Sequence, residues 1–233
     1  MPTLSYAERR GRLETYFDRT AVDAWKRLTS DAPLGRIRAS VRAGRDRMRG
    51  TLLGWLPADL RGARLLDAGC GTGALAVEAA RRGAHVVAVD ISPTLVRLAG
   101  ERTPRDLGAG RVEFRVGDMV DPALGSFDFA VAMDSLIHYR APDCVRAIAG
   151  IAARTRHGVL FTFAPRTPAL AAMHAVGRLF PRGNRAPAIE PVAPDGLRRS
   201  LADDPALRNW SAARTERVAH GFYTSQAQEL RSR

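Results

Sequence analysis

Lysine is almost absent from this chain of 233 residues, whose 36 basic side chains include a single lysine, Lys26. Cysteine is nearly as scarce, with Cys70 and Cys144 alone. No spaced set of cysteines and histidines has the pattern of a zinc site, and a disulfide framework is equally unexpected from two thiols. The cysteine content therefore predicts no protein-bound metal and a reducing, cytoplasmic compartment.

Long hydrophobic runs are also missing. No stretch reaches the ~20 apolar residues that a transmembrane helix needs. The most apolar long stretch, PALAAMHAVGRLF at 168–180, is shorter and contains a histidine and an arginine. The first residues, MPTLSYAERRGRLE, lack the apolar core of a secretion signal. We therefore expect no transmembrane segment and no secretory signal, whereas segment 168–180 is compatible with peripheral membrane contact or with a lid over a substrate.

Positive charge is in excess, with a formal net charge of +12. Such a balance is compatible with a nucleic acid, an anionic membrane surface or an acidic substrate. It is equally compatible with the composition of a GC-rich genome, because arginine and alanine are both abundant. The basic residues are spread along the chain, and it contains no basic block interleaved with aromatic residues of the kind that stacks single-stranded bases. We therefore expect no nucleic-acid partner.

What the chain does contain is enough apolar sequence, 45% of its residues, for one large domain. Apolar runs alternate with helical patterns through its middle, and alternation of this kind predicts an α/β fold with a doubly wound, mostly parallel sheet. The expected strands are the segments ARLLDAGCG, HVVAVD, VEFRVGD, FDFAVAMD and GVLFTFAP.

The flanking regions differ from this core. Residues 7–28 have apolar positions at helical spacing, and a second helix that ends before Pro57 carries an apolar stripe. The stripe consists of Ile37, Val41, Met48 and Leu52. A break at residues 220–221 predicts a C-terminal antiparallel hairpin. We divide the chain into an N-terminal helical arm (1–56), a Rossmann-like core (57–166), a helical or irregular substrate-covering insert (167–204) and edge strands that complete the sheet (205–233).

The segment LLDAGCGTGALA carries the strongest functional signal. Its three glycines follow the first expected strand, where they allow a tight turn and close approach of the backbone to a ligand. Glycines in this pattern also occur in dinucleotide-binding domains. Three acids add detail: Asp67 precedes the glycines, Asp90 ends the second strand, where it can accept bonds from ribose hydroxyls, and Asp118 follows the third strand, where it can meet an adenine amino group.

These motifs resemble the class I S-adenosylmethionine-dependent methyltransferases over roughly residues 60–165. The resemblance implies S-adenosylmethionine as cofactor, with S-adenosylhomocysteine as product. In that family the first acid and the glycines face the methionine half, the second acid the ribose, the third with its neighbour the adenine, and the residues after the fourth strand the sulfonium. The cofactor-binding residues implied are Asp67, Gly69, Cys70, Gly71, Gly73, Asp90, Ile91, Asp118, Met119, Met133 and Asp134.

Two details of this assignment stay open. A nicotinamide-binding Rossmann domain is the structural alternative for the glycine loop. Cys70 is expected to pack within the loop rather than to act as a nucleophile, and Asp134 either binds the cofactor or holds the turn that follows it.

Further segments narrow the resemblance. They are YFDRTAVDAWKRLTSD with IRASVRAGRDRMR, MDSLIHY, and LFPRGNRAPAIEPV with GFYTSQAQELR. Together they are similar, nearly end to end, to the magnesium-protoporphyrin IX O-methyltransferases of bacteriochlorophyll and chlorophyll biosynthesis. The resemblance implies methylation of one propionate of Mg-protoporphyrin IX to the monomethyl ester. It also implies contact with the magnesium chelatase that delivers the porphyrin, and a cytoplasmic enzyme with peripheral contact at the photosynthetic membrane.

His138 and Tyr139 follow the fourth strand, at the edge where open α/β sheets bind ligands. A carboxylate, with a pKa of about 4, is already an anion at neutral pH. The site must therefore strip water from it and align it, more than deprotonate it. We predict His138 and Tyr16 as the catalytic or orienting pair. The alternatives are that His138 is an axial magnesium ligand or a structural residue, and that Tyr16 is a core residue.

We predict that Tyr139, which follows the fourth strand, binds the substrate together with Arg182 and Arg185. The insert that contains these two arginines also has apolar side chains, and an arginine can hold a carboxylate through two hydrogen bonds. Ordinary loop arginines are the alternative. The arm is expected to close over the cofactor. Three other functions remain: methylation of a quinone or phenol with His138 as base, non-catalytic porphyrin carriage, and RNA methylation, which only the charge suggests.

Overall fold

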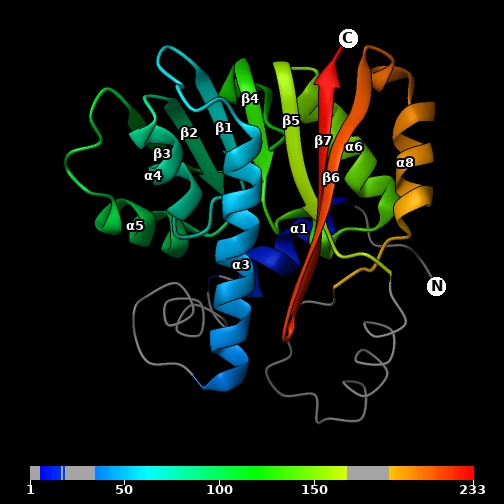
Figure 1. The fold of residues 1–233 in the computed structure, drawn as a ribbon, viewed down its shortest axis with the longest axis horizontal. Helices are drawn as coiled ribbons and strands as arrows, with labels where there is room; N and C mark the ends of the chain where they lie inside the picture. The colour runs from blue at the N-terminus through cyan, green and yellow to red at the C-terminus, as the bar shows by residue number, and fades with distance from the viewer. Residues whose placement is uncertain (1–5, 17, 19–34, 167–188) are drawn as a thin grey trace.

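The computed structural model describes residues 6–16, 18, 35–166 and 189–233 (Figure 1). Its strands are β1 (Arg64–Ala68), β2 (His85–Asp90), β3 (Arg111–Val116), β4 (Phe127–Ala132), β5 (Thr155–Phe163), β6 (Trp210–His220) and β7 (Tyr223–Ser232). Its helices are α1 (Tyr6–Thr15), α3 (Arg36–Trp55), α4 (Ala74–Arg81), α5 (Pro93–Arg102), α6 (Ala141–Ala152) and α8 (Pro194–Asp203). Three short 3-10 turns are η2 (Pro122–Leu124), η3 (Leu136–His138) and η4 (Pro205–Leu207).

The strands form one sheet in the order β3-β2-β1-β4-β5-β7-β6. β1 to β5 run parallel, as continuous apolar strands between helices are expected to do. β7 pairs antiparallel with β5 and with β6, so the C-terminal hairpin extends the sheet at one edge. The predicted doubly wound, mostly parallel sheet with a C-terminal antiparallel hairpin is therefore confirmed.

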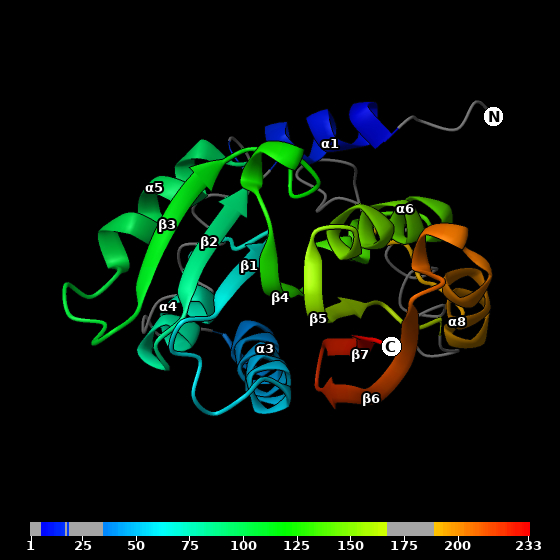
Figure 2. The ribbon, with the colours of Figure 1, turned by 90° about the horizontal axis from the view of Figure 1, so that it is seen from above.

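Two apolar cores lie on the two faces of the sheet (Figure 2). Side chains of α3 and α4 pack on one face, and side chains of α6 and α8 pack on the other. Leu13 of α1 joins the second core. Because both faces are covered, the central strands are buried on both sides, which explains why β1, β2 and β4 are nearly continuous runs of apolar residues.

Only the C-terminal half of α3 matches the apolar stripe predicted for it. Met48 and Leu52 are fully buried, but Ile37 is 56% exposed. The first turns of α3 extend beyond the strands (Figure 1), so an apolar residue there has no sheet to pack against. Helical periodicity identified the helix correctly, yet it could not show how far the sheet reaches along it.

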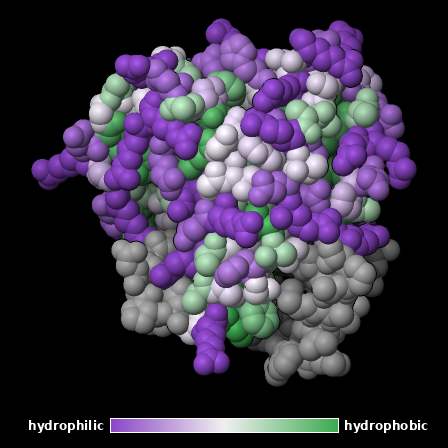
Figure 3. Space-filling model, in the orientation of Figure 1, coloured by the Kyte–Doolittle hydropathy of each residue, from purple (hydrophilic) through white to green (hydrophobic). Residues whose placement is uncertain are grey.

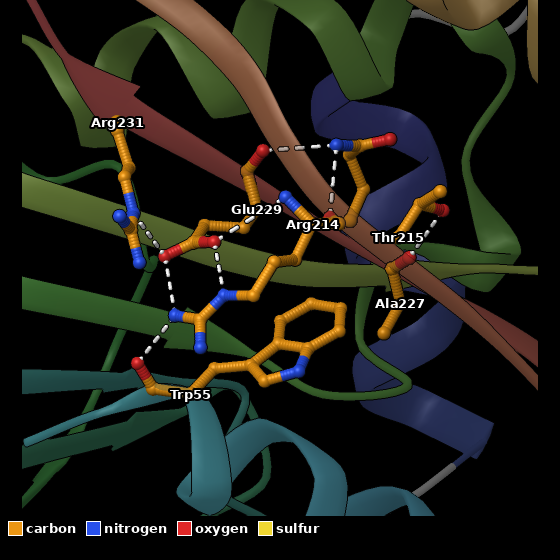
Figure 4. A network of polar contacts seen from close by, with 7 residues as sticks. Trp55, Arg214, Thr215, Ala227, Glu229 and Arg231 are labelled. Carbon is orange, nitrogen blue, oxygen red and sulfur yellow. Dashed lines mark hydrogen bonds and ion pairs between the residues drawn. The ribbon is translucent and has the colours of Figure 1, made fainter.

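An ion-pair network around the buried Glu229 carboxylate fastens the C-terminal hairpin to α3 (Figure 4). The Glu229 carboxylate, on a residue 3% exposed, accepts hydrogen bonds from Arg214 Nε at 2.6 Å and from Arg231 Nε at 2.8 Å. Arg214 Nη2 also donates to the Trp55 carbonyl at 2.6 Å, and the guanidinium lies 5.2 Å from the centre of the indole. These hydrogen bonds satisfy a buried carboxylate that would otherwise be costly to desolvate.

The chain segments on either side of residues 167–188 lie side by side at the end of β5. Pro165 pairs with Val192. The Arg166 N–H donates to the Val192 carbonyl at 2.8 Å, and the Val192 N–H donates to the Ala164 carbonyl at 2.9 Å. Helix α8 forms the last part of the insert, whereas residues 167–188 are outside the described residues, as are half of the residues predicted to be helical over 7–28. The boundaries proposed for the four segments stay predictions.

Hydrophilic side chains cover most of the face seen in Figure 3, with apolar ones scattered among them. Within the described ranges, no helix is long and apolar enough to cross a membrane.

Candidate functional site

The glycine loop connects β1 to α4 in a backbone conformation that suits glycine. Gly69, Gly71 and Gly73 have φ values of 84°, 54° and 79°, in the left-handed region that other residues rarely adopt. A Cβ on Gly69 would lie 2.4 Å from Cβ of Ser135, so the loop packs directly against the chain that follows β4. The backbone of the loop therefore approaches another segment of the same protein closely, while its approach to a ligand stays a prediction.

Asp67 lies at the end of β1 beneath this loop and is 2% exposed. The backbone N–H of Ala76, in the first turn of α4, lowers the pKa of this carboxylate against the larger effects that raise it. Among the described residues, Asp67 Oδ2 has no hydrogen-bond partner. Burial, and then the negative charge of Asp90, raise the pKa of Asp67 to about 7. A buried acid with an open acceptor atom suits a ligand that carries a donor or a positive charge.

Asp90 ends β2 and organises the loops around it. Its two oxygens accept the backbone N–H groups of Gly71 and Ser92, each at 2.9 Å. Burial raises the pKa of Asp90, and these two bonds oppose the rise. Each carboxylate oxygen can accept a second bond, so the residue can still receive a ribose hydroxyl as predicted. Ile91 follows it and packs at the edge of one apolar core.

Asp118, after β3, contacts the N-terminal arm. Tyr6 donates its hydroxyl to Asp118 Oδ1 at 2.9 Å, and Arg10 Nη1 donates to Oδ2 at 3.0 Å. Met119, which follows, is 7% exposed and belongs to the core. Helix α1 therefore covers the acid that was predicted to meet the adenine. Sequence analysis identified the acid but missed Tyr6 and Arg10, because nothing in the local pattern of an N-terminal helix indicates a contact more than a hundred residues away.

Met133 and Asp134 follow β4. Met133 is 9% exposed and packs in the core that contains α3 and α4. Asp134 has a φ of 53°, and its side chain is 3% exposed. Its carboxylate accepts hydrogen bonds from protein donors, including Arg45 Nη1 at 2.8 Å and the Tyr223 hydroxyl at 3.0 Å. Of the two roles considered for Asp134, these contacts favour holding the turn.

His138 ends the short turn η3, directly before Tyr139. A side chain of α1 contacts the backbone of this turn: Arg9 Nη1 donates to the His138 carbonyl and to Glu190 Oε1, both at 2.9 Å. Tyr139 is 3% exposed and stacks on Tyr6, with 5.2 Å between ring centres. Contact of Tyr139 with a substrate therefore requires α1 to move, whereas His138 is only half-buried.

The remaining predicted residues differ in what can be said of them. Tyr16, half-buried just after α1, has a pKa raised by burial, so its hydroxyl keeps its proton. Burial, and then the charges of Asp67 and Asp90, raise the pKa of the Cys70 thiol, which agrees with a packing residue rather than a nucleophile. Arg182 and Arg185 lie outside the described residues. In the part of the chain that is described, no group of three His, Cys, Asp or Glu side chains could hold a metal ion.

Comparisons with known proteins identify two matching families and a similar full-length relative. A family described as "Magnesium-protoporphyrin IX methyltransferase C-terminus" matches residues 132–232, and a "Methyltransferase domain" family matches residues 65–158. The magnesium-protoporphyrin O-methyltransferase of Rhodobacter capsulatus is 53% identical over 232 residues, which cover 99% of this chain and 100% of the relative.

A solved structure and a more distant relative complete the comparison. The crystal structure of magnesium protoporphyrin IX methyltransferase from Synechocystis PCC 6803 with bound S-adenosylhomocysteine superposes with a TM-score of 0.84 at 28% identity, and the match covers 96% of this chain and 100% of that one. A ubiquinone biosynthesis O-methyltransferase of Xanthomonas oryzae is 39% identical over 135 residues, covering 54% of this chain and 55% of the relative.

Proposed function

Because this chain belongs to the magnesium-protoporphyrin O-methyltransferase family, we propose that it methylates a propionate carboxylate of Mg-protoporphyrin IX with S-adenosylmethionine. The products are the monomethyl ester and S-adenosylhomocysteine. The observation that carries this proposal is the 53% identity to the Rhodobacter capsulatus protein over the full length of both chains. A match confined to the core would support only a class I methyltransferase, whereas this one includes the arm, the turn after β4 and the C-terminal hairpin.

The described residues fit the cofactor. Two buried polar atoms beside the glycine loop, Asp67 Oδ2 and Ser135 Oγ, have no hydrogen-bond partner among the described residues. Bound S-adenosylmethionine supplies an electrophilic methyl group on a positively charged sulfur. We assign Asp67 to the methionine end of the cofactor, Asp90 to the ribose and Asp118 to the adenine, and the positive φ values of the glycines support a close approach of the backbone.

The chain has to hold the carboxylate nucleophile more than activate it, because a propionate is already ionised at neutral pH. His138 lies at the carboxyl ends of the parallel strands, where it can donate a hydrogen bond to one carboxylate oxygen and leave the other oriented for transfer. Tyr16 keeps its proton, since burial raises its pKa, and so can donate a second bond. Holding the substrate in this way excludes water and aligns the oxygen with the methyl–sulfur bond.

Helix α1 supports this arrangement. It contacts Asp118 after β3 through Tyr6 and Arg10, and the His138 carbonyl after β4 through Arg9. The arm is therefore suited to cover both the cofactor and the reacting carboxylate. Substrate contacts of Arg182 and Arg185, contact with magnesium chelatase and peripheral membrane contact stay predictions.

The proposal is tested by a methyl-transfer assay with labelled S-adenosylmethionine and Mg-protoporphyrin IX. Wild type is expected to form labelled ester, and His138→Ala to lose about a hundredfold in turnover with unchanged S-adenosylhomocysteine affinity. His157→Ala is the matched control, because this exposed histidine lies on β5 away from the site. A folded wild type that binds the cofactor but forms no ester would contradict the proposal.

A second candidate function has one observation in its favour. The 135-residue match to a ubiquinone biosynthesis O-methyltransferase shows that related cores are found with quinone-type substrates. A phenol must lose its proton before transfer, so His138 would act as a general base in that reaction. Competition between Mg-protoporphyrin IX and a polyprenyl catechol in one assay distinguishes the two substrates.

A further inference from the structure

Asp134 lies two residues after the end of β4 and has an unusual backbone conformation. It is the only non-glycine residue with a positive φ, 53°, in the part of the chain that the structure describes. Aspartate tolerates this region better than most residues, but the conformation still needs support from its surroundings. Thr162 on β5 provides that support, because its Oγ1 accepts the Asp134 N–H at 2.7 Å and donates back to Oδ1 at 3.1 Å.

The Asp134 carboxylate is already surrounded by donors from three elements. Arg45 on α3 donates to Oδ2 at 2.8 Å, and the hydroxyls of Tyr223 and Ser225 on β7 lie 3.0 and 3.3 Å from Oδ1. Thr162 on β5 completes the set. A carboxylate offers about four acceptor sites, so these donors fill it. With its side chain 3% exposed, Asp134 has little capacity left for a cofactor.

The position of the Tyr223 hydroxyl is itself fixed by packing between α3 and β7. A Cβ added to Gly44 would lie 2.6 to 2.7 Å from atoms of the Tyr223 side chain, so the ring fills the space that this glycine leaves. The Tyr223 ring is therefore clamped between helix and strand while its hydroxyl reaches Asp134. A phenylalanine would keep the packing and remove only the bond.

The turn at Asp134 controls a short segment that leads to the reacting groups. Ser135 comes next and lies against Gly69, η3 follows, and η3 ends at His138. The far end of the segment is fixed separately, since Tyr139 is 3% exposed and its ring stacks on Tyr6 of α1 with 5.2 Å between ring centres. With one end determined by Asp134 and the other by Tyr139, His138 has a defined position relative to the glycine loop.

We propose that Asp134 is a positioning residue: held by Arg45 and Tyr223, it sets the direction in which the chain leaves β4 and so places His138 for methyl transfer. This inference rests on the proposed function of His138. It assigns the C-terminal hairpin a role in the reaction, because β7 supplies two of the donors that hold Asp134. It also separates Asp134 from the cofactor-binding residues with which its sequence position grouped it.

The first test compares Tyr223→Phe with Arg214→Ala. Both remove donors to a buried carboxylate from the same hairpin, but Arg214 serves Glu229 at the end away from the site. In single-turnover assays on folded protein, Tyr223→Phe is expected to slow methyl transfer about tenfold with S-adenosylhomocysteine affinity unchanged within about twofold. Arg214→Ala is expected to lower the melting temperature and leave the single-turnover rate unchanged.

A double-mutant comparison separates positioning from a general structural effect. If Tyr223 acts through His138, Tyr223→Phe slows wild type but has no further effect in the His138→Ala background. An equal loss in both backgrounds would overturn the proposal. A roughly tenfold weaker affinity for S-adenosylhomocysteine in Asp134→Asn would also overturn it, since that result makes Asp134 a cofactor contact.

A readout independent of activity keeps this inference distinct from the proposed function. Amide hydrogen exchange of residues 135–139 is expected to become faster in Tyr223→Phe and to stay at the wild-type rate in Arg214→Ala. Unchanged exchange in Tyr223→Phe would overturn the positioning role whatever the substrate is. If wild type binds cofactor and forms no ester while exchange responds as expected, the proposed function fails and the positioning of this segment stands.

Discussion

At the scale of single residues, the buried carboxylate of Asp67 in the candidate site lowers the free energy of unfolding when it is ionised. Its pKa is raised from 3.8 to about 7, first by burial and then by the charge of Asp90. Between about pH 4 and pH 7 the unfolded chain has released this proton and the folded chain still holds it, so the free energy of unfolding falls as pH rises. Above pH 7 the penalty is complete, of the order of 4 kcal/mol at most.

Asp67→Asn should therefore stabilise the ligand-free protein much more at pH 8 than at pH 4, because the amide carries no charge that burial would penalise. Melting temperatures measured across this pH range check the prediction, with the exposed Asp203→Asn as control. The same variant is expected to bind S-adenosylmethionine more weakly, since it loses the negative charge that we propose to meet the methionine end. A stability difference that does not depend on pH would contradict the raised pKa.

Gly69 offers a second test at this scale, with Gly62 as its matched control. Both have a positive φ, of 84° and 76°, so alanine at either site costs about 1 kcal/mol or more in backbone strain. Only at Gly69 would the new Cβ meet a neighbour, 2.4 Å from Ser135 Cβ. Gly69→Ala is expected to lose about tenfold or more in cofactor affinity and turnover, whereas Gly62→Ala loses stability alone. Equal effects on activity would contradict the contact.

At the scale of elements, the arm is the part whose removal should affect the site most. Tyr6 and Arg10 contact Asp118, Arg9 contacts the His138 carbonyl, and Asp18 accepts bonds from Ser92 and Thr94 at the start of α5. Deleting residues 1–35 leaves α3 and its core intact. We expect about tenfold weaker binding of S-adenosylhomocysteine and a larger loss of turnover, measured by calorimetry and by the ester assay.

The control for this deletion is a chain that lacks residues 1–5 only, which retains every described contact of the arm. It should bind and turn over like wild type. If the chain lacking residues 1–35 also kept both cofactor affinity and turnover, the arm would have no covering role, and the hydrogen bonds to Asp118 would be structural.

The elements also show where sequence analysis succeeds and where it stops. Strands β1, β2 and β4 were predictable because burial on both faces demands continuous apolar runs, and the hairpin because of the break at His220–Gly221. The contacts of Asp134 were not predictable, since its donors come from α3, β5 and β7 and meet only in the folded sheet. Exposure of Ile37 was missed for a related reason: local periodicity does not show where a neighbouring element ends.

The acids of the candidate site illustrate the same limit. Positions after strands of a parallel sheet converge at one edge, so grouping Asp67, Asp90 and Asp118 required only the strand order. The cover of Tyr6 over Asp118 depends on a side chain that the motif does not include. Motif spacing therefore pointed to this edge of the sheet as the candidate site but could not tell which of its acids already have protein partners.

At the scale of the whole molecule, the net charge of +12 still has two explanations, attraction of an anionic substrate and genomic composition. They predict different responses to salt. Ions at 1 M shorten the screening length to about 3 Å from about 10 Å at 0.1 M, so long-range attraction of the two propionates should weaken as salt is added.

If the arginine excess attracts the porphyrin, the KM for the porphyrin rises several-fold between about 0.05 and 0.5 M salt. The kcat stays constant, because groups inside the covered site are screened little. The KM for S-adenosylmethionine, which is a net cation, should not rise. Mg-protoporphyrin dimethyl ester provides the control, since it lacks both carboxylates and its inhibition constant should be independent of salt. A porphyrin KM that is equally independent of salt would leave composition as the reason for the excess, and recognition of the substrate would then rest on the short-range contacts around His138.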